Sequence, residues 1–190
     1  MTTFEIKTPH STHQVVEKKL TSLGLYVTAR EAYDMWKADP ERIKVLDVRT
    51  SVEYAVNGHA EMAANIPVAF QSYKWDITKG DYPVVVNTEF VASVAKRFKL
   101  DDTILAMCRS GTRSAVAVNF LAKGGFTNVY NIFDGFDGDK VEDPGSIWYG
   151  VRRRNGWKNS VVPWTYKFDP TLVWVPTDAE LEILRTLPDR

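Results

Sequence analysis

The sequence contains very little cysteine and histidine. Among its 190 residues there is one cysteine, Cys108, and there are three histidines. A single cysteine excludes an internal disulfide framework and a Cys-x-x-Cys redox pair within the chain. With so few thiol and imidazole groups, a zinc site of the usual Cys/His type is not expected either. We therefore expect a fold held together by its hydrophobic core, with no metal and no organic cofactor.

An excess of one charge and long hydrophobic runs are also missing. The 24 basic residues balance the 24 acidic ones, whereas a nucleic-acid-binding domain usually presents a strongly basic face. No stretch approaches the roughly 18 apolar residues that a membrane-spanning helix needs, and Met1–Lys7 lacks the apolar run of a secretory signal. These absences predict a cytoplasmic protein that binds neither nucleic acid nor a membrane, and they leave its oligomeric state open.

Short apolar strands alternate with helical segments along most of the chain. This alternation predicts an α/β domain with a mostly parallel sheet, and a chain of this length can bury a core without disulfides or metal. The expected helices are Thr12–Leu23, Thr28–Pro40, Thr50–Gly58, Phe90–Phe98, Ser114–Lys123 and Asp178–Leu187, and the expected strands are Ile43–Val48, Thr103–Met107 and Val129–Ile132. Capping boxes are expected at Thr28 with Glu31, Thr50 with Glu53 and Thr177 with Glu180. We expect Asn87 to cap the fourth helix and Pro67–Pro83 to be a surface excursion.

One polar loop of this predicted sheet carries the candidate chemistry. Cys108-Arg109-Ser110-Gly111-Thr112-Arg113 follows a buried strand and leads into a helix, and parallel sheets bind ligands beyond such strand ends. Backbone N–H groups at a helix N-terminus attract anions. Gly111 lets the loop curl, because glycine accepts positive φ without a steric cost. Together with the charges of Arg109 and Arg113, these features favour a thiolate at Cys108 over the neutral thiol.

The same loop, continued to Ser114, resembles the active-site loop of rhodanese-like sulfurtransferases. Other segments resemble the family in order and spacing. They are Leu46-Asp47-Val48-Arg49, Glu53-Tyr54, Gly58-His59, Asn65-Ile66-Pro67, Gly125-Phe126, Val129-Tyr130-Asn131-Ile132, Gly135, Gly156-Trp157-Lys158 and Pro163. The resemblance covers residues 28–164. It departs from the family at Met62 and Phe136, which stand where glycines are usual, and in an insertion at about 137–155.

The resemblance implies a rhodanese-like three-layer fold, a mostly parallel β-sheet with helices on both faces. The domain would span residues 28–165, including the insertion. Residues 1–27 would form an N-terminal helical extension, and residues 166–190 a C-terminal extension packed on the domain.

The resemblance also implies a thiosulfate sulfurtransferase in which Cys108 is the nucleophile and sulfur carrier. The Cys108 thiolate would take the outer sulfur of a small anionic donor, such as thiosulfate or a persulfide, and pass it to cyanide, a thiol or a protein acceptor. The residues expected to bind the donor are Arg109, Ser110, Gly111, Thr112, Arg113 and Ser114. The supporting residues are Asp47 and Arg49, expected to form an internal ion pair, Glu53, expected to cap a helix, and His59, for which a structural role is favoured.

Other functions stay open at this point. A phosphatase or arsenate reductase uses a Cys-x5-Arg loop, in which the arginine lies six positions after the cysteine. Arg113 lies five positions after Cys108, and one residue fewer in the loop narrows the ring of backbone amides. A cysteine-protease-like dyad would need His59 as its base. A non-enzymatic binding or sensor module would need no nucleophile. The insertion could rim the site and select a protein acceptor, and its Arg152-Arg153-Arg154 run is expected to be a solvated loop.

Overall fold

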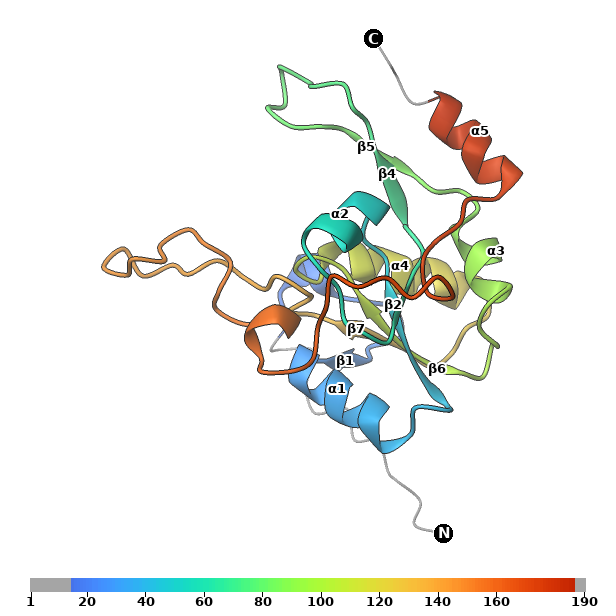
Figure 1. Cartoon of the computed structure of the whole chain (residues 1–190), viewed down its shortest axis with the longest axis horizontal. Coiled ribbons are helices and arrows are strands. Elements are labelled where there is room, and N and C mark those ends of the chain that lie inside the picture. Colours follow the sequence, from blue (N-terminus) through green and yellow to red (C-terminus); the bar gives the residue numbers. More distant parts are fainter. Residues whose placement is uncertain (1–14, 187–190) are drawn as a thin grey trace.

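A five-stranded sheet forms the centre of the computed structural model, which describes residues 15–186. The strand order is β1-β7-β6-β2-β3, and every neighbouring pair is parallel (Figure 1). These strands are β1 (Tyr26–Val27), β2 (Ile43–Asp47), β3 (Ala63–Asn65), β6 (Thr103–Met107) and β7 (Val129–Ile132). The α-helices are α1 (Ala29–Ala38), α2 (Ser51–Val56), α3 (Phe90–Ala95), α4 (Thr112–Lys123) and α5 (Asp178–Thr186).

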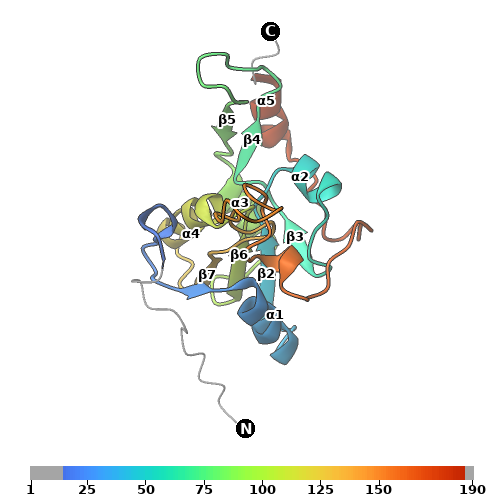
Figure 2. The ribbon, with the colours of Figure 1, turned by 90° about the vertical axis from the view of Figure 1, so that its left-hand side faces the viewer.

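Helices cover both faces of this sheet, so the fold has three layers (Figure 2). Along β6, Leu105 and Met107 belong to a core that includes α1 and the buried Trp157. Ile104 and Ala106 belong to the opposite core, which includes residues of α3 and α4. All five residues of β6 are buried, as a strand covered on both faces requires. The predicted α/β class and the mostly parallel sheet are confirmed.

The strongest local signals of the sequence are found as expected. The three predicted strands are present as β2, β6 and β7. Thr28 with Glu31 and Thr50 with Glu53 form complete capping boxes at the starts of α1 and α2. Thr177 and Glu180 exchange the same bonds before α5. α4 begins at Thr112, two residues before its predicted start at Ser114.

The helix predicted at Thr12–Leu23 is wrong wherever the structure describes it. Residues 15–23 contain only a short 3-10 helix, η2 (Glu17–Lys19), and residues 12–14 lie outside the described range. Polar groups of this segment bond to the domain: the amine of Lys19 lies 3.1 Å from the Asp139 carboxylate, and the amide of Ser22 donates to Asn119 at 2.8 Å. Helical spacing alone is weak evidence for a helix, because most helical stability in proteins comes from tertiary packing.

The predicted details of α3 need correction as well. The helix ends at Ala95, three residues before its predicted end at Phe98, and its N-cap is Glu89. Asn87 accepts a bond from the amide of Glu89 at 3.0 Å, but its own amide donates to Pro67 and Glu180. Asn87 therefore ties α3 to two distant segments and is not the capping residue.

The segment Pro67–Pro83 is more ordered than expected. It contains β4 (Ala69–Gln71), which pairs antiparallel with β5 (Val84–Val86). The two strands form the base of a hairpin that projects from the domain next to α5 (Figure 1). The pairing could not be read from Pro67–Pro83 alone, because the partner strand lies beyond it.

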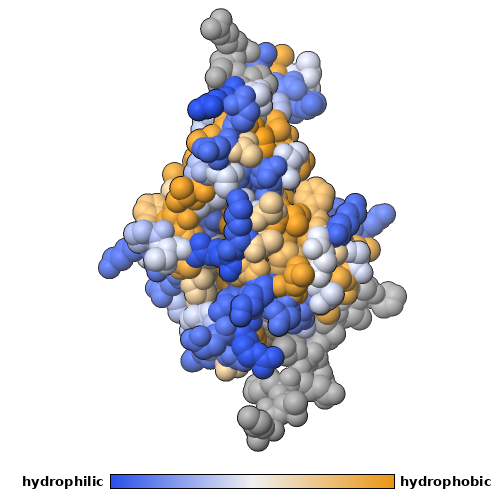
Figure 3. Space-filling model, turned by 90° about the vertical axis from the view of Figure 1, so that its right-hand side faces the viewer, coloured by the Kyte–Doolittle hydropathy of each residue, from blue (hydrophilic) through white to orange (hydrophobic). Residues whose placement is uncertain are grey.

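The chain after residue 166 packs along the domain. The Asn65 amide donates to the Leu172 carbonyl at 2.8 Å, and Leu172 and Trp174 pack against the core beside α3 and α4. Hydrophobic patches alternate with hydrophilic side chains on the face that carries α3 and α5 (Figure 3). This packing agrees with the apolar composition of the tail. The domain limits at residues 28 and 165 stay a prediction, although β1 places residues 26–27 inside the central sheet.

Candidate active site

The Cys108 loop connects the central strand β6 to the N-terminus of α4. Gly111 is the N-cap of α4 and has φ +94°, a left-handed conformation that favours glycine. Its backbone N–H donates to the Sγ of Cys108 at 3.1 Å. The following amides, from Thr112 to Ser114, belong to the first turn of α4, where N–H groups have no intrahelical acceptor. The buried sulfur thus lies at the positive end of a helix.

The segment after β7 forms the floor of this loop. The amide of Phe136 donates to the carbonyl of Cys108 at 2.8 Å, and that of Asp137 to the carbonyl of Arg109 at 3.0 Å. A Cβ placed on Gly135 would lie 2.6 Å from the Ser110 nitrogen. Gly135 is therefore needed for the close approach of two backbones, and the inserted segment begins in direct contact with the loop.

A buried pair of polar side chains lies beneath the sulfur. The Ser114 hydroxyl is 3.4 Å from the Sγ of Cys108 and 2.7 Å from the Oδ1 of Asn131. The Asn131 amide nitrogen donates to the carbonyls of Gly111 and Lys19, at 3.1 and 3.0 Å. Ser114 and Asn131 are both fully buried, so neither can exchange these partners for water.

Arg113 is turned toward Glu53 of α2. Two nitrogen–oxygen distances of 2.6 Å join the guanidinium to the carboxylate. Burial by itself would raise the pKa of Glu53, but the hydrogen bonds and charge of Arg113 lower it to about 2. Burial opposes the charge of Arg113, yet Glu53 raises the pKa of Arg113, with a smaller contribution from Cys108. A donor role of Arg113 toward a substrate anion stays a prediction, because Glu53 occupies its fork of N–H groups.

Asp47 and Arg49 form a fully buried ion pair at the end of β2. The Nη2 of Arg49 lies 2.6 Å from Asp47 and also donates to the carbonyl of Gly58 at 2.8 Å. The guanidinium lies over the ring of Phe136, 4.2 Å from its centroid. Burial opposes its charge, but the charge and hydrogen bonds of Asp47 raise the pKa of Arg49. The pair thus connects the end of β2 to Gly58 and to Phe136, whose amide donates to the carbonyl of Cys108.

His59 occupies a structural position. Its ring stacks on Tyr54 with a centroid distance of 3.8 Å. The ring nitrogens lie 3.1 Å from the carbonyl of Tyr54 and 3.2 Å from that of Lys167. Both nitrogens thus face backbone carbonyls and not the sulfur, which fits poorly with a base for Cys108.

The other predicted site residues of the loop differ in exposure. Arg109 is exposed, whereas Ser110 and Thr112 are half-buried and Gly111 is buried. Gly111 and Ser114 contact the sulfur, and Arg113 is bonded to Glu53. Asp47, Arg49 and His59 lie in the supporting frame.

Two buried polar residues near the loop were not predicted as site residues. They are Asn131, described above, and Asp134, which accepts bonds from the amides of Ala29 and Gly156 at 2.8 and 3.1 Å. Burial raises the pKa of Asp134 to about 6, although these amides oppose the shift. The available signal was a polar residue inside or directly after a short apolar strand. Such a residue must find a buried partner, but the sequence does not name the partner.

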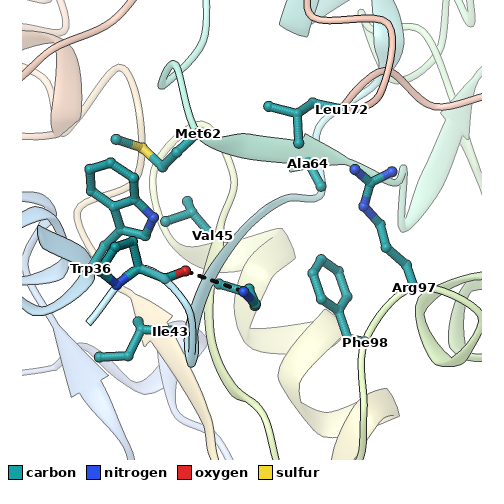
Figure 4. Close-up of a pocket in the computed structure, with 10 residues that line it drawn as sticks. Trp36, Ile43, Val45, Met62, Ala64, Arg97, Phe98 and Leu172 are labelled. Atoms are coloured by element: carbon teal, nitrogen blue, oxygen red, sulfur yellow. Dashed lines mark hydrogen bonds between the residues drawn. The ribbon is translucent and has the colours of Figure 1, made fainter.

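Two surface pockets lie away from the sulfur. One, of about 400 Å³, has Trp36 and Met62 on one side and Phe98 on the other (Figure 4). A second, of about 380 Å³, lies between α2 and the hairpin and is lined by Tyr73, Tyr82 and Trp174 among others. No residue of 108–114 lines either pocket. In residues 15–186, no cluster of His, Cys, Asp and Glu is arranged to hold a metal ion, and no helix suits a membrane span.

Comparison with known proteins agrees with this fold and loop. The chain is 30% identical over 140 residues to an uncharacterized protein of Rickettsia prowazekii, covering 74% of this chain and 96% of the relative. It is 34% identical over 93 residues to thiosulfate sulfurtransferase 16, chloroplastic, of Arabidopsis thaliana, covering 49% of this chain and 70% of that protein. The crystal structure of Rv0390 from M. tuberculosis superposes with a TM-score of 0.56 and 26% identity, over 74% of this chain and 96% of that one.

The sequence model of the Rhodanese-like domain matches residues 28–141. The match includes β2, α2, the complete Cys108 loop, α4 and the floor of the loop. The parallel sheet, the loop between β6 and α4, and the relatives lead to the same assignment. The chain belongs to the rhodanese-like family.

Proposed function

We propose that the protein is a sulfurtransferase that carries sulfane sulfur on Cys108. The observation that supports this most strongly is the position of the Cys108 sulfur at the N-terminus of α4, with the Gly111 N–H donating to it at 3.1 Å. A thiolate is stabilised by such donors and by the positive end of a helix. The similarity to thiosulfate sulfurtransferase 16 of Arabidopsis thaliana adds support, because that protein is named for this activity.

In the first half-reaction, the Cys108 thiolate attacks the outer sulfur of thiosulfate. A bond forms between the two sulfur atoms, the sulfur–sulfur bond of thiosulfate breaks, and sulfite leaves with the electron pair. The loop amides offer donors to the charge on the transferred sulfur, in the manner of an oxyanion hole. Arg109, which is exposed, would attract the dianion by its charge.

In the second half-reaction, cyanide or a thiolate attacks the outer sulfur of the Cys108 persulfide. The new bond forms to the acceptor, and Cys108 leaves as a thiolate ready for another cycle. No second cysteine exists in the sequence to resolve the persulfide. The acceptor must therefore come from another molecule.

The geometry supports a phosphatase less well. A phosphatase loop needs a free guanidinium to hold two phosphate oxygens, whereas both ends of Arg113 are bonded to Glu53. A purely binding module would need neither the amide contact to the sulfur nor a cysteine at this position. Neither alternative is favoured by a specific observation.

The test is thiocyanate formation from thiosulfate and cyanide. We expect turnover by the wild-type protein and none by Cys108→Ser, which keeps a similar shape without the thiol. Hydrolysis of a phosphate ester is measured in parallel. Turnover of the ester alone, or thiocyanate formation equal in the two proteins, would contradict the proposal.

A further inference from the structure

The direction of one hydrogen bond beneath Cys108 follows from the partners of Asn131. Its amide end faces two backbone carbonyls, those of Gly111 and Lys19. A carbonyl oxygen can only accept, so the Nδ2 of Asn131 must lie on this side and its Oδ1 on the other. The Oδ1 then faces the Ser114 hydroxyl at 2.7 Å. Because Oδ1 cannot donate, the single proton of the hydroxyl belongs to this contact.

This assignment leaves a lone pair of the Ser114 oxygen facing the sulfur. The oxygen is 3.4 Å from the Sγ of Cys108, within range of a thiol hydrogen bond. With its proton directed to Asn131, the hydroxyl can accept from the S–H of the thiol but cannot donate to a thiolate. Turning the hydroxyl proton toward the sulfur would leave the buried Oδ1 of Asn131 without a donor, which costs free energy in a site closed to water.

Asn131 therefore acts on both sides of the sulfur. It holds the carbonyl of Gly111, the residue whose N–H donates to the sulfur, and it orients Ser114 below. Its second carbonyl partner comes from Lys19, which the ion pair with Asp139 anchors. The N-terminal segment thus contributes to the orientation of Asn131.

We infer that Asn131 is a positioning residue that makes Ser114 a hydrogen-bond acceptor for the Cys108 thiol. The Gly111 amide favours the thiolate, and the Ser114–Asn131 pair favours the thiol. The inference rests on the proposed function only for its consequence, which is that the sulfur carrier has a hydrogen-bond acceptor on one side and an amide donor on the other.

The test is the rate of Cys108 alkylation by iodoacetamide as a function of pH, since only the thiolate reacts. Removal of an acceptor from the thiol by Ser114→Ala is expected to raise the rate at pH 7 roughly fivefold. The pH profile of the alkylation rate should move to lower pH, and the maximal rate reached at high pH should stay unchanged. The plateau reports access to the sulfur, so it separates a change in ionisation from a more open site. Slower alkylation of Ser114→Ala at pH 7 would show a hydroxyl that donates to the thiolate, and an unchanged profile would show no effect; either result overturns the inference.

Asn131→Leu tests the relay itself. Leucine has a similar shape but no acceptor, so the Ser114 hydroxyl becomes free to donate to the sulfur. The profile is expected to move further than in Ser114→Ala. In the Ser114→Ala background, Asn131→Leu should move the profile less than it does in the wild type, because no hydroxyl remains to be released. The shift that remains there reports the loss of the bond to the Gly111 carbonyl. Equal effects of Asn131→Leu with and without the hydroxyl would contradict the relay.

Two controls keep the test decisive. Ser93→Ala removes another bonded helical hydroxyl, which donates to Glu180 at 3.0 Å outside the site, and its alkylation profile should match the wild type. If Asn131→Leu does not fold, Ser114→Ala alone still decides the direction of the bond. Alkylation needs no sulfur donor, so failure of thiosulfate to load Cys108 would overturn the proposed function without deciding this inference.

Discussion

The guanidinium of Arg113 forms a bidentate ion pair with the carboxylate of Glu53, with both nitrogen–oxygen distances at 2.6 Å. This contact joins the first turn of α4 to the first turn of α2. It fixes the start of α4 that lies beside the sulfur, and it occupies the N–H groups at the end of the Arg113 side chain. Arg109 is the exposed arginine of the loop.

Removing the charge of Glu53 should destabilise the fold. Glu53→Gln keeps the capping box, because glutamine also serves at this position, so the change isolates the ion pair. The Arg113 side chain is 27% exposed, and we expect a loss of about 2 kcal/mol, below the cost of breaking a fully buried pair. Urea unfolding measures the change. Asp34→Asn breaks the exposed pair of Arg30 and Asp34 and should cost less than about 0.5 kcal/mol; equal losses in the two variants would contradict this account.

A methyl group at Gly111 should disrupt the Cys108 loop. A Cβ there would lie 2.1 Å from the carbonyl oxygen of Phe133, at φ +94°. Gly80 also has a positive φ, +62°, but its Cβ would meet nothing within 4 Å. We expect Gly80→Ala to cost about 1 kcal/mol, from backbone strain alone.

Gly111→Ala should cost at least about 2 kcal/mol more than Gly80→Ala, since strain and overlap combine. It should also lose thiocyanate formation, because the N–H of the same residue contacts the sulfur. Unfolding curves and steady-state rates of the two variants provide the comparison. A Gly111→Ala protein as stable and active as Gly80→Ala would rule out the described packing of the loop.

The stability of the protein should fall between pH 4 and pH 7 because of Asp134. Burial raises its pKa from an ordinary 3.8 to about 6, so the folded state holds this proton more tightly than the unfolded chain. The associated stability is complete below pH 3.8 and is lost as the pH rises through 6. A shift of about two units corresponds to about 3 kcal/mol.

Asp134→Asn removes this titration and should flatten that part of the curve. The variant also loses one acceptor for the amides of Ala29 and Gly156, so its stability should be lower at pH 4. Glu53, with a lowered pKa of about 2, acts in the opposite sense: its contribution is present above pH 4.5 and is lost as the pH falls toward 2. Chemical denaturation of both proteins from pH 4 to 7 measures the difference, and parallel curves would exclude Asp134 as its source.

An element of the fold could be predicted from the sequence where its pattern is local, within a few residues of the chain. The continuous apolar run Thr103–Met107 indicates a strand buried on both faces, and the capping boxes mark the starts of α1, α2 and α5 by short-range spacing. The two-residue β1 and three-residue β3 carry no such pattern, because they are defined only by pairing with β7 and β2. Periodicity alone therefore could not find them.

The candidate site shows the same division. The cysteine, the glycine and the arginines of the loop form one contiguous motif, so the chain order alone assembles them. The partners of those residues are distant in sequence: Glu53 lies 60 positions from Arg113, and Asn131 lies 17 positions from Ser114. Lys19 reaches the site through its backbone carbonyl, a contact on which its side-chain type has no bearing.

The insertion at about 137–155 forms an arm that should govern the choice of sulfur acceptor. It projects from the domain beyond the floor of the loop (Figure 1), and Ile147 near its end is 88% exposed. At its base, the Arg152 guanidinium donates to the Gly138 carbonyl at 2.7 Å. Replacing residues 141–151 with a short turn keeps this base. We expect thiosulfate loading to be unchanged and the ratio of rates with protein thiols and with cyanide to fall. An unchanged ratio would discard this role for the arm.

The most direct measurement is the intact mass of the protein after incubation with thiosulfate and removal of excess donor. The account predicts a gain of one sulfur atom per chain, carried by the peptide that contains Cys108 and released as thiocyanate on addition of cyanide. Cys108→Ser should gain no mass. A wild-type protein that takes up no sulfur, or a Cys108→Ser protein that takes up as much, would contradict the claim that this cysteine carries the transferred atom.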